Sequence, residues 1–210
     1  MFLQKFSCGP FHTNAILLAC EKTNKAAVID PSLGSTELIL KIVEKRGLKI
    51  EQILLTHSHW DHIADLSLLK EKTGAPVFVH PLDAENVRDP GSDGIPLFVV
   101  IRGVEPDGFL EEGKEVLLGK LRIEVIHTPG HSPGSICLYL REQKTLLSGD
   151  TLFKGTIGNL HLPTGQAERM WVSLRKLAAL PPETKVIPGH GEDTLLSQET
   201  WLKNAEQLFT

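Results

Sequence analysis

Three histidines and one aspartate lie within a six-residue stretch early in the chain: His57, His59, Asp61 and His62. Imidazole nitrogens and carboxylate oxygens are ligands that zinc, iron and manganese accept, so this stretch has the composition of a metal site. A polar surface loop is the alternative interpretation. Imidazoles this close together repel one another when protonated and lose solvation when buried, and a bound cation relieves both costs. The sequence therefore favours a metal site.

The same kind of junction recurs at three later places. An apolar run that reads as a strand ends shortly before His131, before Asp150 and before His190. In many folds, binding groups lie just after strand ends. The irregular backbone there can direct the side chains, and the rigid sheet fixes their positions. We therefore expect the four segments to converge. The candidate metal ligands are His57, His59, Asp61, His62, His131, Asp150 and His190.

This set of residues, in this order and with these flanks, resembles the metallo-β-lactamase superfamily and, within it, the glyoxalase II (hydroxyacylglutathione hydrolase) branch. The resemblance runs from Asp30 to Gly191. It is specific, because four separate segments must agree. It implies an α+β fold, a four-layer αββα sandwich of two β-rich halves, formed as a single domain by residues 1–210.

The resemblance also implies two divalent metal ions, with zinc expected and iron or manganese compatible with the same ligands. Two cations about 3.5 to 4 Å apart lower the pKa of a shared water, so a bridging hydroxide is available near neutral pH. Asp61 and Asp150 are the carboxylates that this implies for catalysis. The implied assignment is His57, His59 and His131 for the first metal, Asp61, His62 and His190 for the second, and Asp150 as the bridge.

A small-molecule thioester such as S-lactoylglutathione is the predicted substrate. The sequence shows no Ser-His-Asp or Cys-His nucleophile motif, and a thiolate leaves readily because its pKa is near that of cysteine, about 8.5. An amide such as a β-lactam needs more help for the departing nitrogen. Two alternatives stay open: a mononuclear iron persulfide dioxygenase, which shares these motifs, and a metal-binding protein without catalysis, for which seven ligands would have little purpose.

Two features depart from the glyoxalase II pattern. Short relatives carry an Arg after Ile-Gly and an Asp two residues later, whereas this chain has Asn159 and His161 there. We expect both side chains to border the substrate channel. The chain also reads as a short form without the C-terminal helical domain that contacts glutathione in full-length enzymes, so the sequence leaves glutathione recognition open.

The elements that must position these residues follow from hydrophobic periodicity and helix-end signals. Asp30 ends the second strand of an opening hairpin and reads either as a turn former or as an acceptor that steadies the metal ligands. Helices are predicted at 36–46, 63–72 with a start near Asp61, 81–87, 166–180 and 195–209. Strands are predicted at 15–19, 26–29, 50–55, 77–79, 121–126, 145–147 and 185–187.

Residues 88–108 are rich in Gly, Pro and Asp and are expected to form a loop beside the active site. His12 and His80 read as structural or exposed residues rather than ligands. His127 reads as a residue that packs beside the ligand loop.

Composition limits the partners. The formal net charge is −4 and there is no basic run, which argues against nucleic acid. No apolar run is long enough to span a bilayer, and the three cysteines are scattered, so we expect a cytoplasmic protein with reduced thiols and no membrane partner.

Overall fold

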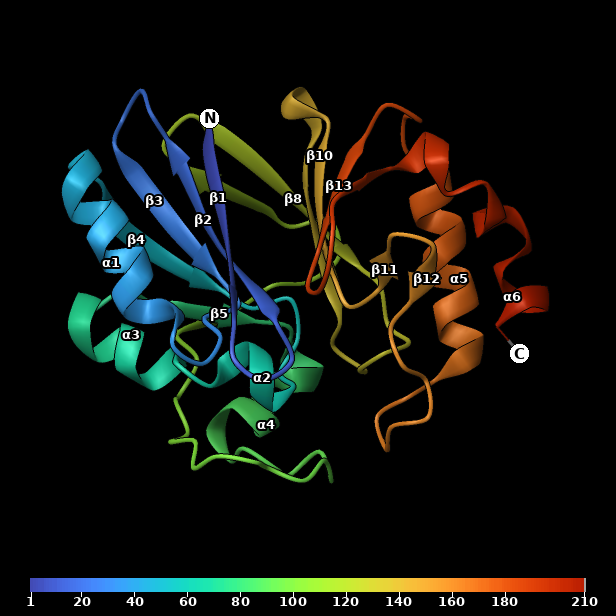
Figure 1. The fold of residues 1–210 in the computed structure, drawn as a ribbon, viewed down its shortest axis with the longest axis horizontal. Coiled ribbons are helices and arrows are strands. Elements are labelled where there is room, and N and C mark those ends of the chain that lie inside the picture. The colour runs from blue at the N-terminus through green and yellow to red at the C-terminus, as the bar shows by residue number, and fades with distance from the viewer. Residues whose placement is uncertain (210) are drawn as a thin grey trace.

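Two six-stranded sheets pack face to face in the computed structural model, which describes residues 1–209 (Figure 1). The first sheet has the order β1 (Phe2–Cys8), β2 (Thr13–Cys20), β3 (Lys25–Ile29), β4 (Lys49–Leu54), β5 (Val77–Val79) and β6 (Gly108–Phe109). The second has the order β14 (Thr194–Leu195), β13 (Lys185–Pro188), β10 (Thr145–Gly149), β9 (Ile136–Leu140), β8 (Leu121–His127) and β7 (Glu115–Leu118). A separate small hairpin joins β11 (Leu152–Phe153) to β12 (Thr156–Ile157).

Helices cover the outer faces of both sheets. The α-helices are α1 (Ser35–Arg46), α2 (Trp60–Ile63), α3 (Leu66–Thr73), α4 (Ala84–Arg88), α5 (Ala167–Ala178) and α6 (Ala205–Leu208). Figure 1 shows α1 and α3 on one side of the molecule and α5 and α6 on the other. The predicted four-layer αββα sandwich is confirmed. No helix within residues 1–209 is long and apolar enough to cross a bilayer.

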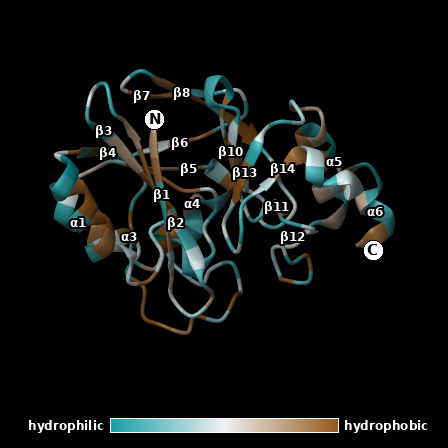
Figure 2. Ribbon diagram, turned by 45° about the horizontal axis from the view of Figure 1, so that its top comes forward, coloured by the Kyte–Doolittle hydropathy of each residue, from teal (hydrophilic) through white to brown (hydrophobic). Residues whose placement is uncertain are grey.

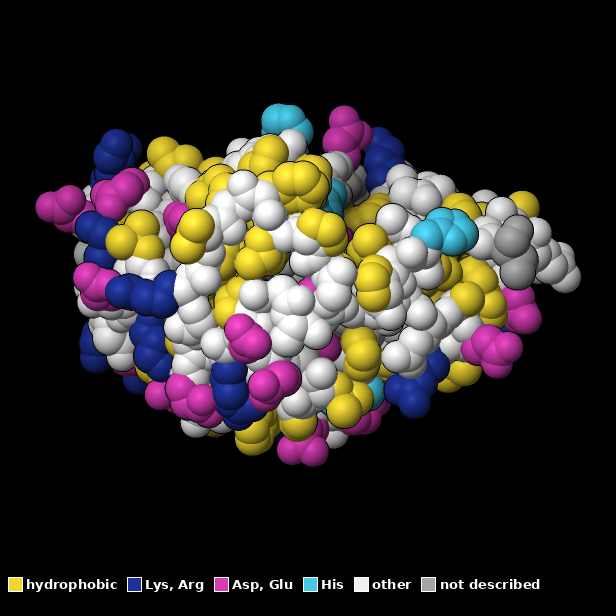
Figure 3. Space-filling view, turned by 90° about the horizontal axis from the view of Figure 1, so that it is seen from below, with side chains coloured by type: hydrophobic (Ala, Val, Ile, Leu, Met, Phe, Trp, Pro, Cys, Tyr) yellow, Lys and Arg dark blue, Asp and Glu magenta, His cyan; other side chains and the backbone are white. Residues whose placement is uncertain are grey.

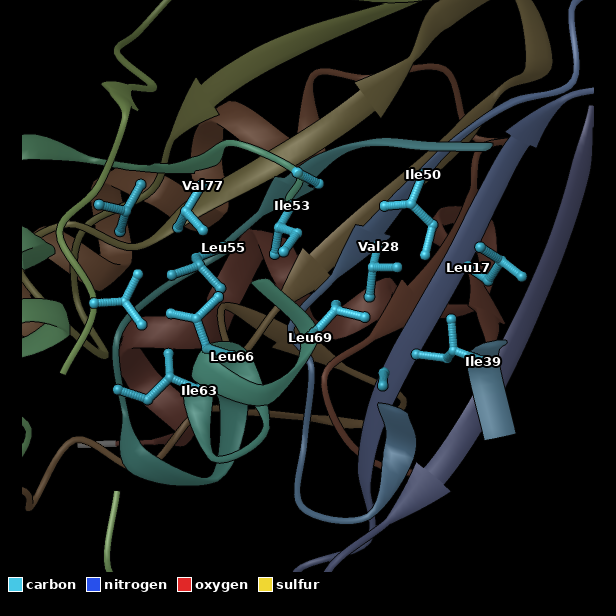
Figure 4. Close-up of a cluster of buried hydrophobic side chains, with 14 of the residues drawn as sticks. Leu17, Val28, Ile39, Ile50, Ile53, Leu55, Ile63, Leu66, Leu69 and Val77 are labelled. Carbon is cyan, nitrogen blue, oxygen red and sulfur yellow. The ribbon is translucent and has the colours of Figure 1, made fainter. Parts of the chain in front are cut away.

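Strand β2 shows why the layers form, because its alternate side chains enter two different cores. Leu17 packs with Val28 and Ile39 of α1 on the outer face of the first sheet (Figure 4). Ile16 and Leu18 point the other way, into the core between the sheets. Full burial of each such side chain stabilises the fold by about 1.5 to 3 kcal/mol. Figure 2 shows the resulting hydrophobic strands and the two-faced outer helix α1.

The predicted elements are mostly present, with three corrections. The predicted hairpin forms as β2 and β3, but the sequence analysis missed β1, whose mixed polar and apolar residues line the edge of the first sheet. The helix predicted at 63–72 is broken into α2 and α3, because the backbone N–H of Asp65 donates to Pro31 O and the Asp65 carboxylate accepts from Thr36 N.

The prediction of a helix at 195–209 is also wrong. Residues 194–195 pair with β13, and the rest is two 3₁₀ turns followed by the short α6. The Glu199 carboxylate accepts from Thr194 Oγ1, Gly155 N and Trp201 Nε1. These tertiary hydrogen bonds outweigh the local preference for a continuous helix.

The candidate ligands follow strand ends on one edge of the sandwich. Residues 57–62 follow β4, His131 follows β8, Asp150 follows β10, and His190 follows β13. Strands β10 and β13 are parallel, so their carboxyl ends coincide. The two sheets are joined at this edge, since Ile136 N donates to Thr56 O at 2.8 Å.

The buried carboxylate of Asp83, just before α4, ties together two ligand-bearing loops. It accepts hydrogen bonds from Ser58 N at 2.9 Å, from Ser132 Oγ at 2.8 Å and from Gly134 N at 2.6 Å. Ser58 belongs to the first ligand stretch, and Ser132 and Gly134 flank the loop of His131. Asp83 therefore fixes the distance between segments that lie far apart in the sequence.

We expect Asp83→Ala to lower the free energy of unfolding by about 2 to 4 kcal/mol, because it leaves buried donors of both loops unpaired. Urea denaturation at matched metal content measures the change. Glu85→Ala is the control, since Glu85 is exposed and forms one ion pair within residues 1–209, with Arg88 at 3.5 Å, and it should change stability by about 0.5 kcal/mol or less. Equal losses in the two variants would show that Asp83 does not brace the loops.

Candidate metal centre

The seven predicted ligands meet at one point, in two groups. Nitrogen atoms of His57, His59 and His131 lie within 4.8 Å of one another. Ligand atoms of Asp61, His62 and His190 form a second group by the same measure. These are the two sets that the family resemblance implies for separate metals. Asp30, His57 and His62 form a third group by the same measure.

Asp150 lies between the two groups. Its Oδ2 is 3.4 Å from His131 Nε2 and 3.3 Å from His190 Nε2, and its Oδ1 is 3.4 Å from His62 Nε2. The carboxylate thus contacts a member of the first group and two members of the second.

One nitrogen of each imidazole is held from outside the cluster. The outer contacts are His57 Nδ1 with Thr56 Oγ1 (3.1 Å), His59 Nε2 with Thr164 Oγ1 (3.0 Å), His62 Nδ1 with Asp30 Oδ2 (3.0 Å), His131 Nδ1 with Asn159 O (2.9 Å) and His190 Nδ1 with Phe11 O (3.0 Å). Such contacts fix the orientation of the ring and leave its second nitrogen for a metal. The arrangement is the one that a metal centre requires.

Two inward atoms support this fit. His57 Nε2 and Asp150 Oδ1 are buried, and within residues 1–209 neither makes a hydrogen bond, although Asp150 Oδ1 lies 3.4 Å from His62 Nε2. His62 Nε2 and His190 Nε2 are only 3.3 Å apart. Burying an unpaired nitrogen and an unpaired carboxylate oxygen costs free energy, and a cation at this point would accept electron pairs from both. The donors therefore fit divalent metal ions.

The electrostatics differ between the two groups. Burial and the His131 imidazole lower the pKa of His59 to about 3, and burial with neighbouring imidazoles holds the pKa of His57 well below its usual range. In the second group burial opposes protonation, but Asp61 and Asp150 raise the pKa of His62 well above its usual range.

For His190, burial lowers the pKa, but its contacts with Asp150 and Asp61 outweigh this and raise the pKa to about 9. Burial alone would raise the pKa of Asp61, yet the charge of His62 dominates and lowers it to about 2. The two carboxylates thus favour the protonated imidazoles of His62 and His190 where a cation would otherwise sit, and metal binding must release those protons.

Close backbone packing brings two of the segments together. An added Cβ on Gly189 would lie 2.2 Å from Asp150 Oδ1. One on Gly149, whose φ is +49°, would lie 2.6 Å from Thr56 Oγ1. The glycines that precede His190 and Asp150 are therefore required for these ligands to approach one another.

Sequence reasoning missed several residues that support the site. Thr13 Oγ1 donates to Asp61 Oδ2 at 2.6 Å, and Asn86 Nδ2 donates to Ser58 O at 2.7 Å. Thr164 similarly contacts His59, and Asp83 similarly accepts hydrogen bonds from the two ligand loops. These side chains lie far from the ligands in sequence and carry no motif, so nothing in a single sequence marks them.

Asp30 acts as an acceptor rather than only as a turn former. It accepts from Thr56 N at 2.8 Å and Thr56 Oγ1 at 2.6 Å, besides its contact with His62. Its φ of +51° also places it in a turn conformation. Both interpretations left open by the sequence apply.

The other histidines lie outside the two groups. His80 and His127 stack on each other with ring centroids 4.0 Å apart. Burial and the neighbouring His127 lower the pKa of His80 to about 4. His12 is exposed in the turn before β2, with φ at +54°. None of the three belongs to a ligand group in the described part of the chain.

A pocket of about 420 Å³ opens on the candidate metal ligands. The 88–108 segment contributes Ile95, Pro96 and Phe98 to its wall, so this loop does lie beside the site. Asn159 lines the pocket, as expected for a channel residue. His161 is exposed and is not among the described residues of the wall, and its backbone N–H donates to Asn159 Oδ1.

Comparison with known proteins places the site in a family context. A probable metallo-hydrolase of Bacillus subtilis is 34% identical over 197 residues, which span 91% of this chain and 90% of the relative. A hydroxyacylglutathione hydrolase of Haemophilus influenzae is 33% identical over 198 residues, or 90% of each chain. Another, of Rhodospirillum rubrum, is 38% identical over 174 residues, covering 83% of this chain and 60% of the longer relative.

Three solved structures share the fold. BLEG-1 B3 metallo-β-lactamase superposes with a TM-score of 0.88 at 30% identity over the whole of both chains. The di-iron-bound form of TTHA1623 gives 0.82 at 36% identity, covering 93% of this chain and 96% of the other. ETHE1 from Myxococcus xanthus gives 0.78 at 28% identity, covering 95% and 81%. The model of the Metallo-beta-lactamase superfamily matches residues 8–190, and the chain belongs to that superfamily.

Proposed function

We propose that this metallohydrolase holds two divalent metal ions and hydrolyses thioesters. The observation that carries the proposal is the pair of ligand groups with Asp150 between them. His57, His59 and His131 would hold one ion, and Asp61, His62 and His190 the other. The di-iron form of a similar structure supports two metals and keeps iron beside zinc and manganese as a candidate.

When bound, two such ions lower the pKa of water toward neutrality and polarise a carbonyl oxygen. The residues of the chain supply the geometry for this. Asp150 spans both groups, Thr13 orients Asp61, and Asp30 orients His62. Asn159 lines the pocket, and its Oδ1 accepts from the backbone N–H of His161. No covalent intermediate with a protein side chain is needed.

A thioester is the favoured substrate for a chemical reason, the ease with which a thiolate leaves. The names of the two hydroxyacylglutathione hydrolases similar to this chain point to the same class, with S-lactoylglutathione as the first substrate to measure. A single domain over residues 1–210, a cytoplasmic location and the absence of nucleic-acid and membrane partners stay predictions.

Metal analysis tests the bridging role of Asp150. The purified protein should contain close to two transition-metal ions per chain, and Asp150→Ala should lower occupancy at both positions because both groups lose an oxygen ligand. Elemental analysis by mass spectrometry gives the counts. A full complement in the variant would show that the carboxylate is no bridge.

His62→Ala should lower the kcat/KM for thioester hydrolysis by at least about 10²-fold, the size of loss typical when an electrostatic partner in catalysis is removed. The variant should keep close to one metal per chain, because the first group is intact. His161→Ala is the matched control, since that histidine is exposed and outside both groups, and it should keep the full metal content.

The same variant separates the hydrolase from the alternative dioxygenase. In the persulfide dioxygenases that the sequence resembles, one iron is held by residues matching His57, His131 and Asp150, so His62 would be dispensable for ligation. Oxygen consumption with glutathione persulfide that survives His62→Ala, together with little thioesterase activity in the parent, would replace our proposal with the dioxygenase.

Thioester hydrolysis should exceed β-lactam hydrolysis by about two orders of magnitude or more in kcat/KM, because no acid beyond the ligand set is placed to protonate a leaving nitrogen. The comparison uses S-lactoylglutathione and a chromogenic cephalosporin at equal metal content. Comparable turnover of both would remove the basis for this ranking.

A further inference from the structure

Three aromatic rings from separate segments form one wall of the pocket. Phe11 comes from the turn between β1 and β2, Trp60 from α2, and Phe98 from the 88–108 loop. Their ring centroids are 5.2 Å apart for Phe11 and Trp60, 5.6 Å for Trp60 and Phe98, and 6.1 Å for Phe11 and Phe98. Three segments thus cooperate to build one apolar surface beside the ligands.

Two of the three rings are unusually exposed, whereas Trp60 is buried. Phe98 is 69% and Phe11 50% exposed. Ile95, Pro96 and Leu162 extend the same wall. Large apolar side chains gathered in a pocket and left open to solvent mark a binding surface, because a ligand that covers them removes that area from water. Figure 3, which views this edge of the molecule, shows hydrophobic patches across its middle and most Lys and Arg side chains toward its rim.

Away from the candidate metal ligands, the apolar part of the pocket offers no counter-charge to an anionic ligand. Among residues 1–209, no lysine or arginine lines it. The lysines bonded to the segment after His190 are already engaged: Lys154 pairs with Glu192 at 2.6 Å, and Lys5 pairs with Asp193 and donates to Gly191 O. The two carboxylates of a glutathione moiety would therefore be desolvated in this pocket without partners.

From this wall we propose that the pocket binds the acyl group of the thioester, and that this acyl group is apolar, uncharged and of medium length. The proposal rests on the thioester hydrolysis proposed above. The carbonyl must lie at the ligands Asp61, His131, Asp150 and His190, which form the polar end of the same pocket. The leaving thiolate develops negative charge and is better solvated by water, so the apolar wall suits the group that stays uncharged.

The decisive experiment holds the leaving group constant and varies the chain. Thioesters of N-acetylcysteamine with acetyl and hexanoyl groups are compared by kcat/KM, beside S-lactoylglutathione. Each buried methylene raises kcat/KM about fourfold, so the hexanoyl ester should exceed the acetyl ester by at least about tenfold. It should also exceed S-lactoylglutathione.

Phe98→Ser should reduce the hexanoyl-to-acetyl ratio at least about threefold while leaving the metal content in place. Val100→Ser is the matched control, because Val100 lies in the same loop, is fully exposed and is outside the wall, and it should keep the parent ratio. A parent ratio near one, a preference for S-lactoylglutathione, or an unchanged ratio in Phe98→Ser overturns the proposal.

A binding measurement keeps this proposal separate from the proposed function. The thioether ketones S-(2-oxoheptyl)- and S-(2-oxopropyl)-N-acetylcysteamine resemble the two esters but cannot be hydrolysed. Isothermal titration calorimetry should give at least about tenfold tighter binding of the longer ketone. If no thioester is hydrolysed but the longer ketone still binds more tightly, only the proposed hydrolase activity is refuted. If the two ketones bind equally, only the proposed apolar acyl chain is refuted.

Discussion

The rest of the site depends on the hydrogen bonds that the Asp30 carboxylate accepts. It stands at the end of β3, accepts both the backbone N–H and the hydroxyl of Thr56 after β4, and accepts from His62 in α2. Through Thr56 it also controls His57, whose Nδ1 contacts the same hydroxyl. One buried acceptor thus orients two imidazoles, one from each ligand group, and sets them relative to two strands. Its backbone adopts a left-handed conformation to do so, a local strain that these hydrogen bonds offset.

Support of this kind continues outward in layers. The imidazoles are held by hydroxyls and backbone carbonyls, and these groups are held by strand ends, by Asp83 and by glycines that allow close approach. The sheets beneath are fixed by a core in which alternate residues serve two layers. The reactive end of the pocket is therefore rigid and polar, while its entrance, formed by the turn at Phe11 and the 88–108 loop, is apolar and open.

Much of the fold and the site could be predicted from the sequence, because dense clusters of unusual residue types are recognisable without a structure. Seven His and Asp residues at strand ends predicted where the site lies, and alternating apolar runs predicted most strands. What failed had a different physical origin. Asp65 interrupts a helix through a hydrogen bond to Pro31, and Glu199 replaces a helix with 3₁₀ turns through contacts to distant residues. Thr13, Asp83 and Thr164 are ordinary polar residues whose roles exist only after folding. The apolar wall was invisible for the same reason, since Phe11, Trp60 and Phe98 meet only in three dimensions.

The division of ligands between the sheets has a thermodynamic meaning. Each group takes two side chains from the first half of the chain and one from the second: His57 and His59 with His131, and Asp61 and His62 with His190. A third group, Asp30 with His57 and His62, lies wholly in the first half, but neither half holds either of these two groups complete, so each of the two ions would act as a non-covalent cross-link between the two sheets. The free energy of metal binding then adds to the free energy that holds the two sheets together. This contribution grows with the logarithm of the free metal concentration. The proposed metal ions would in this way make the association of the two halves depend on how much metal the surroundings supply.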